Sequence, residues 1–226
     1  MIPLRDINPT ARTPIVTWGL IALLVMVHAY QAISGEDVIG TWGMVPAELT
    51  ERGGLTEYTR LVTSMFVHAG WLHLIGNVWF LHVFGDNVED DLGRGPFLAF
   101  FLASGLGAAA THVVIDPSSP LPMVGASGAI AGVLGAYLVL HPRARVIALV
   151  VVFFAEVPAW VFLFVWFGLQ LLYAFSSLGL EPESGGVAFF AHVGGFVTGL
   201  MMIFALRRTR DDPRDEGSQK GLSGGA

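Results

Sequence analysis

Six apolar stretches separated by polar loops constrain the fold of this 226-residue chain more than any other feature. They lie near residues 13 to 33, 71 to 85, 96 to 115, 127 to 141, 158 to 177 and 187 to 206. A helix needs about 20 apolar residues to cross a hydrocarbon core of about 30 Å, and lipid leaves the backbone few other conformations. We therefore expect an all-α, polytopic membrane protein with six transmembrane helices.

The composition excludes several classes of function. Only 13% of the residues are charged, against about 25% in soluble domains, so the lipid bilayer is the expected solvent. The formal charge of −6 comes from acidic residues in the loops and the tail, and it indicates no nucleic-acid partner. Because the chain has no cysteine, disulfides, thiolate catalysis and cysteine zinc sites are excluded.

The apolar pattern also predicts the domain limits. We expect one membrane domain over residues 1–206 and a polar, glycine-rich, disordered tail over 207–226. Pro158 suits the first turn of a helix and is expected to begin the fifth one. The ten apolar residues before Glu156 would then lie along the membrane interface.

The distribution of arginine and lysine predicts the orientation. With a cytoplasmic N-terminus, six spans place ten of these residues inside and only Arg52 and Arg60 outside. We therefore expect both termini in the cytoplasm of a cell whose inner or plasma membrane holds the chain. Helices two, four and six would all run from outside to inside.

Ser127 is the first candidate for chemistry. It stands in Gly125-Ala126-Ser127-Gly128, at the start of the fourth apolar stretch. Free backbone N–H groups and the positive end of the helix dipole can stabilise an oxyanion beside such a serine. Taken alone, the small residues are better explained by close helix contact, since Gly128 and Gly132 form a GxxxG pair.

A serine nucleophile needs a base, and His192 is the best placed of the seven histidines. It lies about five residues into the sixth helix, about 7–8 Å below the outer edge of the hydrocarbon core. The fourth helix is short and begins about 9 Å below that edge, so Ser127 lies at a similar depth. Glycines on both helices would let the two side chains meet.

The second helix carries two further polar residues at this depth. His73 and Asn77 have the i, i+4 spacing that puts both on one helix face. Asn77 would lie about 9 Å below the outer edge, where its amide can donate a hydrogen bond to an oxyanion. Polar groups at one depth on three helices favour a catalytic cavity over isolated interhelical hydrogen bonds.

These residues together resemble the rhomboid family of intramembrane proteases over roughly Tyr58 to Leu200. The resemblance rests on Arg60, on the stretch His68-Ala69-Gly70-Trp71-Leu72-His73 with Asn77, on Gly125-Ala126-Ser127-Gly128 and on Ala191-His192-Val193-Gly194-Gly195-Phe196. It implies a six-helix bundle and a dyad in which Ser127 attacks and His192 relays the proton. It also implies an oxyanion site formed by the Ser127 N–H with His73 and Asn77.

The resemblance has further implications for partners. The substrates would be membrane proteins, cleaved in or near a transmembrane segment without metal or any other cofactor. Lateral entry between helices two and five would make Trp160, Phe164 and Phe167 gate candidates, although an aromatic stripe on a lipid-facing helix more often reflects ordinary packing. Arg60 would anchor a loop, or extend its side chain to the interface.

The chain departs from well-known members at one position, where Ala131 stands in place of a tyrosine that packs on the catalytic histidine. Without an acidic residue at that depth, packing and a backbone carbonyl are expected to restrain His192. Gln170 is interpreted as an interhelical hydrogen-bonding residue.

Two other functions remain open: an inactive rhomboid-like protein that binds membrane clients, and a small transporter. An inactive relative need not keep both Ser127 and His192, and a transporter site is expected nearer the midplane. A metalloprotease is not expected, because no HExxH pattern occurs.

Overall fold

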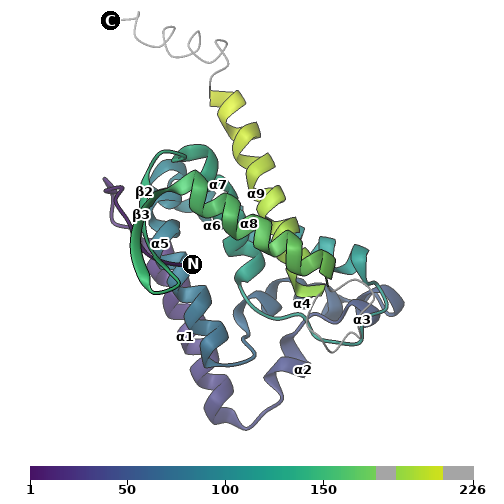
Figure 1. Cartoon of the computed structure of the whole chain (residues 1–226). Coiled ribbons are helices and arrows are strands. Elements are labelled where there is room, and N and C mark those ends of the chain that lie inside the picture. Colours follow the sequence, from purple (N-terminus) through teal and green to yellow (C-terminus); the bar gives the residue numbers. More distant parts are fainter. Residues whose placement is uncertain (177–186, 211–226) are drawn as a thin grey trace, which may run out of the picture.

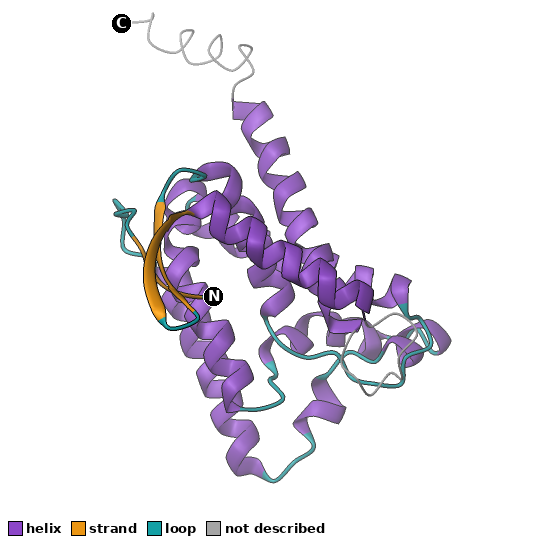
Figure 2. Cartoon of the chain, in the orientation of Figure 1, coloured by secondary structure: helices purple, strands orange, loops and turns teal. Residues whose placement is uncertain are grey.

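The computed structural model describes residues 1–176 and 187–210, and it is mainly helical (Figure 1; Figure 2). Each of the six apolar stretches contains a long helix. These helices are α1 (Ile15–Ser34), α5 (Trp71–Leu92), α6 (Arg94–Ile115), α7 (Ser127–Leu140), α8 (Ala159–Ser176) and α9 (Val187–Arg210). The predicted helical membrane bundle is thus confirmed. Helix α9 continues four residues past the predicted domain limit at residue 206, and residues 211–226 of the predicted tail lie outside the described part.

The helices differ in how far they can reach across a membrane. Within the described residues, α1, α6, α8 and the Phe189–Leu206 part of α9 are each long and apolar enough to cross alone. Helix α5 forms a pair with the preceding Leu55–Phe66 segment, bent by 77°. Helix α7 has only 14 residues, about 21 Å. Because it is shorter than the hydrocarbon core, its first residue can lie below the membrane surface.

Helix α7 forms the centre of the bundle. Every residue from Gly128 to Tyr137 is buried, and its neighbours are α5, α6 and α9. Glycine makes its contact with α9 very close: a Cβ added at Gly199 would lie 2.2 Å from the carbonyl oxygen of Gly132. Small residues allow such backbone contact between membrane helices.

The helical bundle also carries a three-stranded antiparallel sheet, in the order β1-β2-β3, which the sequence did not predict. Strand β1 (Ile2–Asp6) pairs with β2 (Arg145–Val150), which forms a hairpin with β3 (Phe153–Pro158). The apolar residues 146–155, expected along the membrane interface, therefore form most of a β-hairpin, and Pro158 ends β3 immediately before α8. Strands form here because the segment is rich in valine and phenylalanine, which favour extended structure. Figure 2 shows the sheet along one flank of the bundle.

Side chains of α5 hold the N-terminal segment against the bundle. The indole N–H of Trp79 donates a hydrogen bond to the carbonyl oxygen of Pro3, and the Asn87 amide donates to Asp6 over 2.9 Å. The buried carboxylate of Glu89 accepts hydrogen bonds from the backbone N–H groups of Val16 and Thr17, at 3.0 and 2.7 Å. It therefore caps α1, whose N-cap residue is a proline without a capping side chain.

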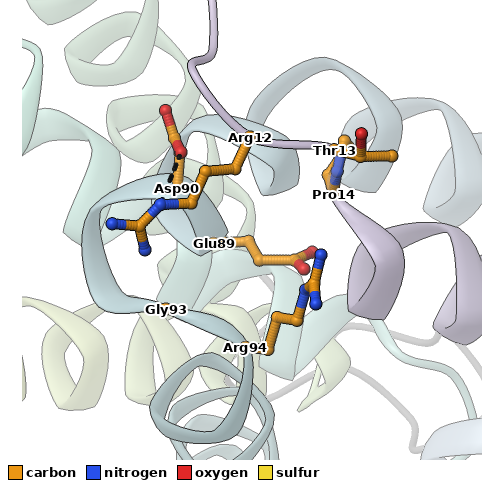
Figure 3. Close-up of a pocket in the computed structure, with 7 residues that line it drawn as sticks. All are labelled: Arg12, Thr13, Pro14, Glu89, Asp90, Gly93 and Arg94. Atoms are coloured by element: carbon orange, nitrogen blue, oxygen red, sulfur yellow. Dashed lines mark ion pairs between the residues drawn. The ribbon is translucent and has the colours of Figure 1, made fainter.

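Figure 3 shows a cavity of about 280 Å³ beside this cap. Arg12 and Asp90 form an ion pair on one side of it, and the side chains of Glu89 and Arg94 lie on the other. This cavity lies at the C-terminal end of α5, away from the predicted site near the start of that helix.

The loop between α1 and α5 is folded into short helices. They are α2 (Val38–Trp42), α3 (Pro46–Glu51), α4 (Leu55–Thr63) and a 3₁₀ turn, η1 (Ser64–Phe66). The Arg60 guanidinium donates to the Thr41 carbonyl oxygen over 3.0 Å and forms an ion pair with Glu48. Of the two interpretations of Arg60, loop anchor and interfacial cation, these contacts favour the anchor.

Candidate active site

Ser127 is the first residue of α7, and the backbone before it is shaped by a glycine. Gly125 has φ of 113°, a conformation that side chains with a Cβ rarely adopt. A Cβ at Gly125 would also lie 2.7 Å from the Nε2 atom of His73. Glycine therefore both directs the chain into α7 and lets the His73 ring approach.

The start of α7 supplies hydrogen-bond donors. The first N–H groups of an α-helix lack partners within the helix, and the N–H of Ser127 belongs to this set. Within the helix the first backbone bond runs from the Ile130 N–H to the Ala126 carbonyl oxygen, at 2.9 Å. The hydroxyl of Ser127 is thus accompanied by amide groups suited to an oxyanion.

His192, on α9, lies against Ser127. Its Nε2 atom is 2.8 Å from the Ser127 Oγ atom, although 65 residues separate the two in sequence. The close contact of α7 and α9 makes this distance accessible: a Cβ at Gly195 would lie 2.0 Å from the Gly128 carbonyl oxygen. The structure therefore brings together the two residues predicted as nucleophile and base.

His73 and Asn77 lie on the facing side, on α5. The Asn77 amide donates to the His73 carbonyl oxygen within the helix, over 2.8 Å, while its Oδ1 atom is buried without a partner. One N–H of the Asn77 amide remains after this bond, because a primary amide has two donors. The ring of His73 lies 5.2 Å from that of His68, in an edge-to-face arrangement.

The surroundings of the His192 ring correct one expectation. Its second nitrogen, Nδ1, lies 2.9 Å from the Oε1 atom of Gln170 on α8, so the restraint is a side-chain amide and not a backbone carbonyl. The rings of Trp166 and Phe189 lie 6.4 and 6.0 Å from the imidazole. The expected packing on the His192 ring is therefore present, and aromatic side chains of α8 and α9 supply it.

All four predicted polar residues border one cavity of about 240 Å³. Helices α5, α7, α8 and α9 enclose it, and its lining consists of Leu72, His73, Gly76, Asn77, Phe80, Ser127, Ile130, Trp166, Gln170 and His192. A mostly apolar lining with a few converging polar groups is typical of a ligand site. Across the described parts of the chain, no three histidine or acidic side chains converge in a group that could hold a metal ion.

The three gate candidates lie elsewhere. Phe167 stacks on Phe196 of α9, with ring centroids 4.4 Å apart. Trp160 and Phe164 are exposed and contact each other at 6.3 Å.

The aromatic rings that join α8 to α5 are instead those of Phe162 and Trp166, each 6.4 Å from the ring of Phe80. The sequence did not identify Phe162 and Trp166, because hydrophobicity alone does not show which side of a mostly apolar helix faces α5.

Comparison with known proteins identifies the family to which the chain belongs. The model of the Rhomboid domain matches residues 55–209 of this chain, a region that includes all of the residues bordering the cavity. This match covers well over half of the chain, and the chain belongs to the rhomboid family.

Curated relatives agree with this assignment. RHOMBOID-like protein 5 of Arabidopsis thaliana is 31% identical over 164 residues, which is 73% of this chain and 48% of that protein. Rhomboid protease GluP of Bacillus subtilis is 35% identical over 129 residues, 55% of this chain and 24% of that protein. The putative rhomboid protease YdcA of Bacillus subtilis is 40% identical over 85 residues, 36% of this chain and 41% of that protein. The chain thus spans less than half the length of these relatives.

Proposed function

We propose that this rhomboid-family protein is an intramembrane serine endopeptidase that cleaves membrane proteins in or near a transmembrane segment. The observation that carries the proposal is the 2.8 Å distance between Ser127 Oγ and His192 Nε2 in a cavity shared with two further polar side chains. Nucleophile and base within hydrogen-bond reach is the arrangement that activates a serine hydroxyl. The names of two Bacillus subtilis relatives, both called rhomboid proteases, agree with this reaction.

In the first step, Ser127 Oγ attacks the carbonyl carbon of the scissile peptide while His192 Nε2 takes the hydroxyl proton. The tetrahedral intermediate carries a negative oxygen, which we assign to the Ser127 N–H and the side chains of His73 and Asn77. Breakdown transfers the proton from His192 to the leaving amine and leaves an acyl ester on Ser127. No acidic third residue is required in this scheme.

In the second step, a water molecule attacks the ester while His192 takes its proton. Collapse of the second tetrahedral intermediate returns this proton to Ser127 Oγ and releases the carboxylic acid product. Hydrolysis therefore needs water at the dyad, and the cavity beside Ser127, with its few converging polar groups, gives it a place. We further propose that both termini are cytoplasmic and that the cavity opens to the opposite side, as the arginine and lysine distribution favours.

The purified full chain, assayed in detergent and in liposomes with a model transmembrane substrate, tests this function. We expect cleavage by the wild type, none by Ser127→Ala or His192→Ala, and labelling of Ser127 by a fluorophosphonate. Ser104→Ala is the matched control, because Ser104 is a fully buried serine on α6 whose hydroxyl has no hydrogen-bond partner. Wild-type cleavage by Ser127→Ala would rule out the mechanism. A wild type that binds transmembrane substrates without cleaving them would support the client-binding alternative.

A further inference from the structure

Helix α8, from Ala159 to Ser176, is mostly apolar, and Gln170 is its one side-chain amide. The other polar groups on this helix are hydroxyl and indole groups. We propose that Gln170 is a positioning residue, which orients the His192 imidazole and selects the tautomer that can act as base. The inference rests on the proposed Ser127/His192 dyad and adds a third residue to it. Its main support is the 2.9 Å distance from Gln170 Oε1 to His192 Nδ1.

The chemistry of the amide oxygen determines the tautomer. Oε1 can only accept a hydrogen bond, so the neutral imidazole must carry its hydrogen on Nδ1 to make this contact. The other nitrogen, Nε2, is then an acceptor, 2.8 Å from the Ser127 hydroxyl that would donate to it. The opposite tautomer would place an N–H against the nucleophile and leave Nδ1 facing an acceptor. The Gln170 contact therefore favours the one neutral form that can take the serine proton.

The same contact also restrains the ring. The imidazole of His192 is flanked by Trp166 at an interplanar angle of 39° and by Phe189 at 84°, contacts that restrict its tilt. Aromatic contacts do not distinguish the two ring nitrogens, whereas a hydrogen bond to Nδ1 does. The side chain of Ala131 has no hydrogen-bonding group, so this discrimination comes from Gln170 on α8.

Helix α8 is attached to α9 in a way that maintains the contact. Ring pairs join the two helices on both sides of Gln170: Phe167 stacks on Phe196 with centroids 4.4 Å apart, and Tyr173 stacks on Phe189 at 5.1 Å. A displacement of α8 from α5 that keeps these ring pairs in place would leave the contact between Gln170 and His192 intact. A displacement of α8 from α9 would instead separate Oε1 from Nδ1 and release the ring.

Gln170 also borders the cavity, so two other roles must be separated from this one. A glutamine that only joins helices would change stability without changing chemistry. A glutamine that binds substrate would change KM. A positioning residue changes kcat and the rate of covalent labelling, while KM stays the same.

The test compares Gln170→Met with Gln170→Glu in the full-length protein. Methionine keeps the length of the side chain but removes the oxygen acceptor, and we expect a fall in kcat of about 3- to 10-fold, the effect of one neutral hydrogen bond. The second-order rate of fluorophosphonate labelling falls by the same factor, and KM is unchanged. Glutamate keeps an acceptor and restores kcat on the pH plateau. It also moves the acid limb of the pH–rate profile to higher pH, because a negative charge beside Nδ1 favours the imidazolium.

The matched control is Gln31→Met. The Gln31 amide donates to the His68 carbonyl oxygen over 2.8 Å, so this variant removes a hydrogen bond between elements outside the dyad. We expect it to lower the melting temperature and leave kcat unchanged.

Wild-type kcat and labelling in Gln170→Met, with Ser127→Ala inactive, would overturn the positioning role and leave the protease intact. A change in KM alone would assign Gln170 to substrate binding. Residual cleavage by Ser127→Ala would instead reject the dyad itself. Histidine ¹⁵N chemical shifts of folded Gln170→Met give a readout independent of turnover: we expect the Nδ1-protonated form to decrease relative to the wild type.

Discussion

The phenolic hydroxyl of Tyr137 donates a hydrogen bond to the carboxylate of Asp6 over 2.6 Å, although 131 residues separate them. Asp6 ends strand β1, and Tyr137 lies near the end of α7, where it is fully buried. The bond therefore fixes the N-terminal strand to the helix that begins with Ser127. Together with the Asn87 amide, Tyr137 gives the half-buried Asp6 carboxylate two donors from separate helices.

The first prediction concerns the pH dependence of stability. Burial is the largest effect on Asp6 and raises the pKa of its carboxyl from 3.8 to about 6, against the lowering effect of the Tyr137 hydrogen bond. The folded state then binds this proton more tightly than the unfolded state does. The Asp6 contribution to stability is therefore greatest below about pH 4 and is lost as the pH rises through about 6.

Thermal unfolding in detergent between pH 4 and 7 measures this effect. We expect the melting temperature of Asp6→Asn to fall less than that of the wild type over this interval, because asparagine does not titrate. Parallel curves for the two proteins would show that Asp6 does not contribute to the slope.

The second prediction removes the hydroxyl of the same pair. Tyr137→Phe keeps the ring, which lies 5.0 Å from that of Phe84, but withdraws a donor from a carboxylate. We expect a loss of about 1–3 kcal/mol in the free energy of unfolding. The control is Tyr173→Phe, a half-exposed tyrosine on α8, which should stay within about 0.5 kcal/mol of the wild type.

Much of the fold followed from the sequence, because runs of about 20 apolar residues have few alternatives to a helix in lipid. The depth of the short helix α7 likewise predicted that Ser127 and His192 would meet. The sheet was missed because the hairpin turn contains Val151 and Val152, without the glycine or asparagine that usually marks such a turn. Val151 adopts a φ of 58° in this turn, and the local sequence does not predict a left-handed conformation for a valine.

The partner of Gln170 was missed for a different reason. Hydrophobicity indicates that α8 is a helix, but because nearly all of its residues are apolar, it does not show which side of the helix faces α9. The contact with His192 depends on that rotation and on the aromatic stacking between α8 and α9. From the sequence, Gln170 could therefore be assigned a role in helix association, but its partner could not be identified.

The third prediction tests the glycine contact between α7 and α9. A Cβ at Gly199 would lie 2.2 Å from the Gly132 carbonyl oxygen, a backbone atom that cannot move without displacing its helix. We expect Gly199→Ala to lower both the melting temperature and the cleavage rate, because the helices must separate. Gly168→Ala on α8 is the matched control, since a Cβ there meets nothing within 4 Å, and alanine favours the helix by about 1 kcal/mol. Equal behaviour of the two variants would argue against the close contact.

The fourth prediction addresses the proposed oxyanion site. Asn77→Ala removes an amide donor that borders the same cavity as Ser127, and we expect kcat to fall by up to about 10²–10³-fold. Asn87→Ala provides the comparison on the same helix: Asn87 binds Asp6 at the far end of α5, so its loss should reduce stability and leave kcat unchanged. Wild-type kcat in Asn77→Ala would assign Asn77 a structural role.

The fifth prediction concerns the route by which a transmembrane segment reaches Ser127. Phe80 of α5 contacts Trp166 of α8 at 6.4 Å, and both residues border the cavity. The contact between α5 and α8 consists mainly of side-chain rings, those of Phe80 and Phe84 against Phe162 and Trp166, whereas the backbone of α8 packs closely along α9. We therefore expect substrate to enter between α5 and α8.

Cross-linking tests substrate entry separately from catalysis. The reagent can react specifically with introduced cysteines, because the chain contains no native cysteine. The double variant Phe80→Cys with Trp166→Cys, joined by a short bifunctional reagent, should lose cleavage of a transmembrane substrate while Ser127 still reacts with a small fluorophosphonate. Its un-cross-linked form controls for the loss of the two rings. Phe175→Cys with Phe190→Cys, at a pair 6.0 Å apart between α8 and α9, should remain active when joined. If the first cross-link leaves cleavage intact, substrate must reach the cavity without parting α5 from α8.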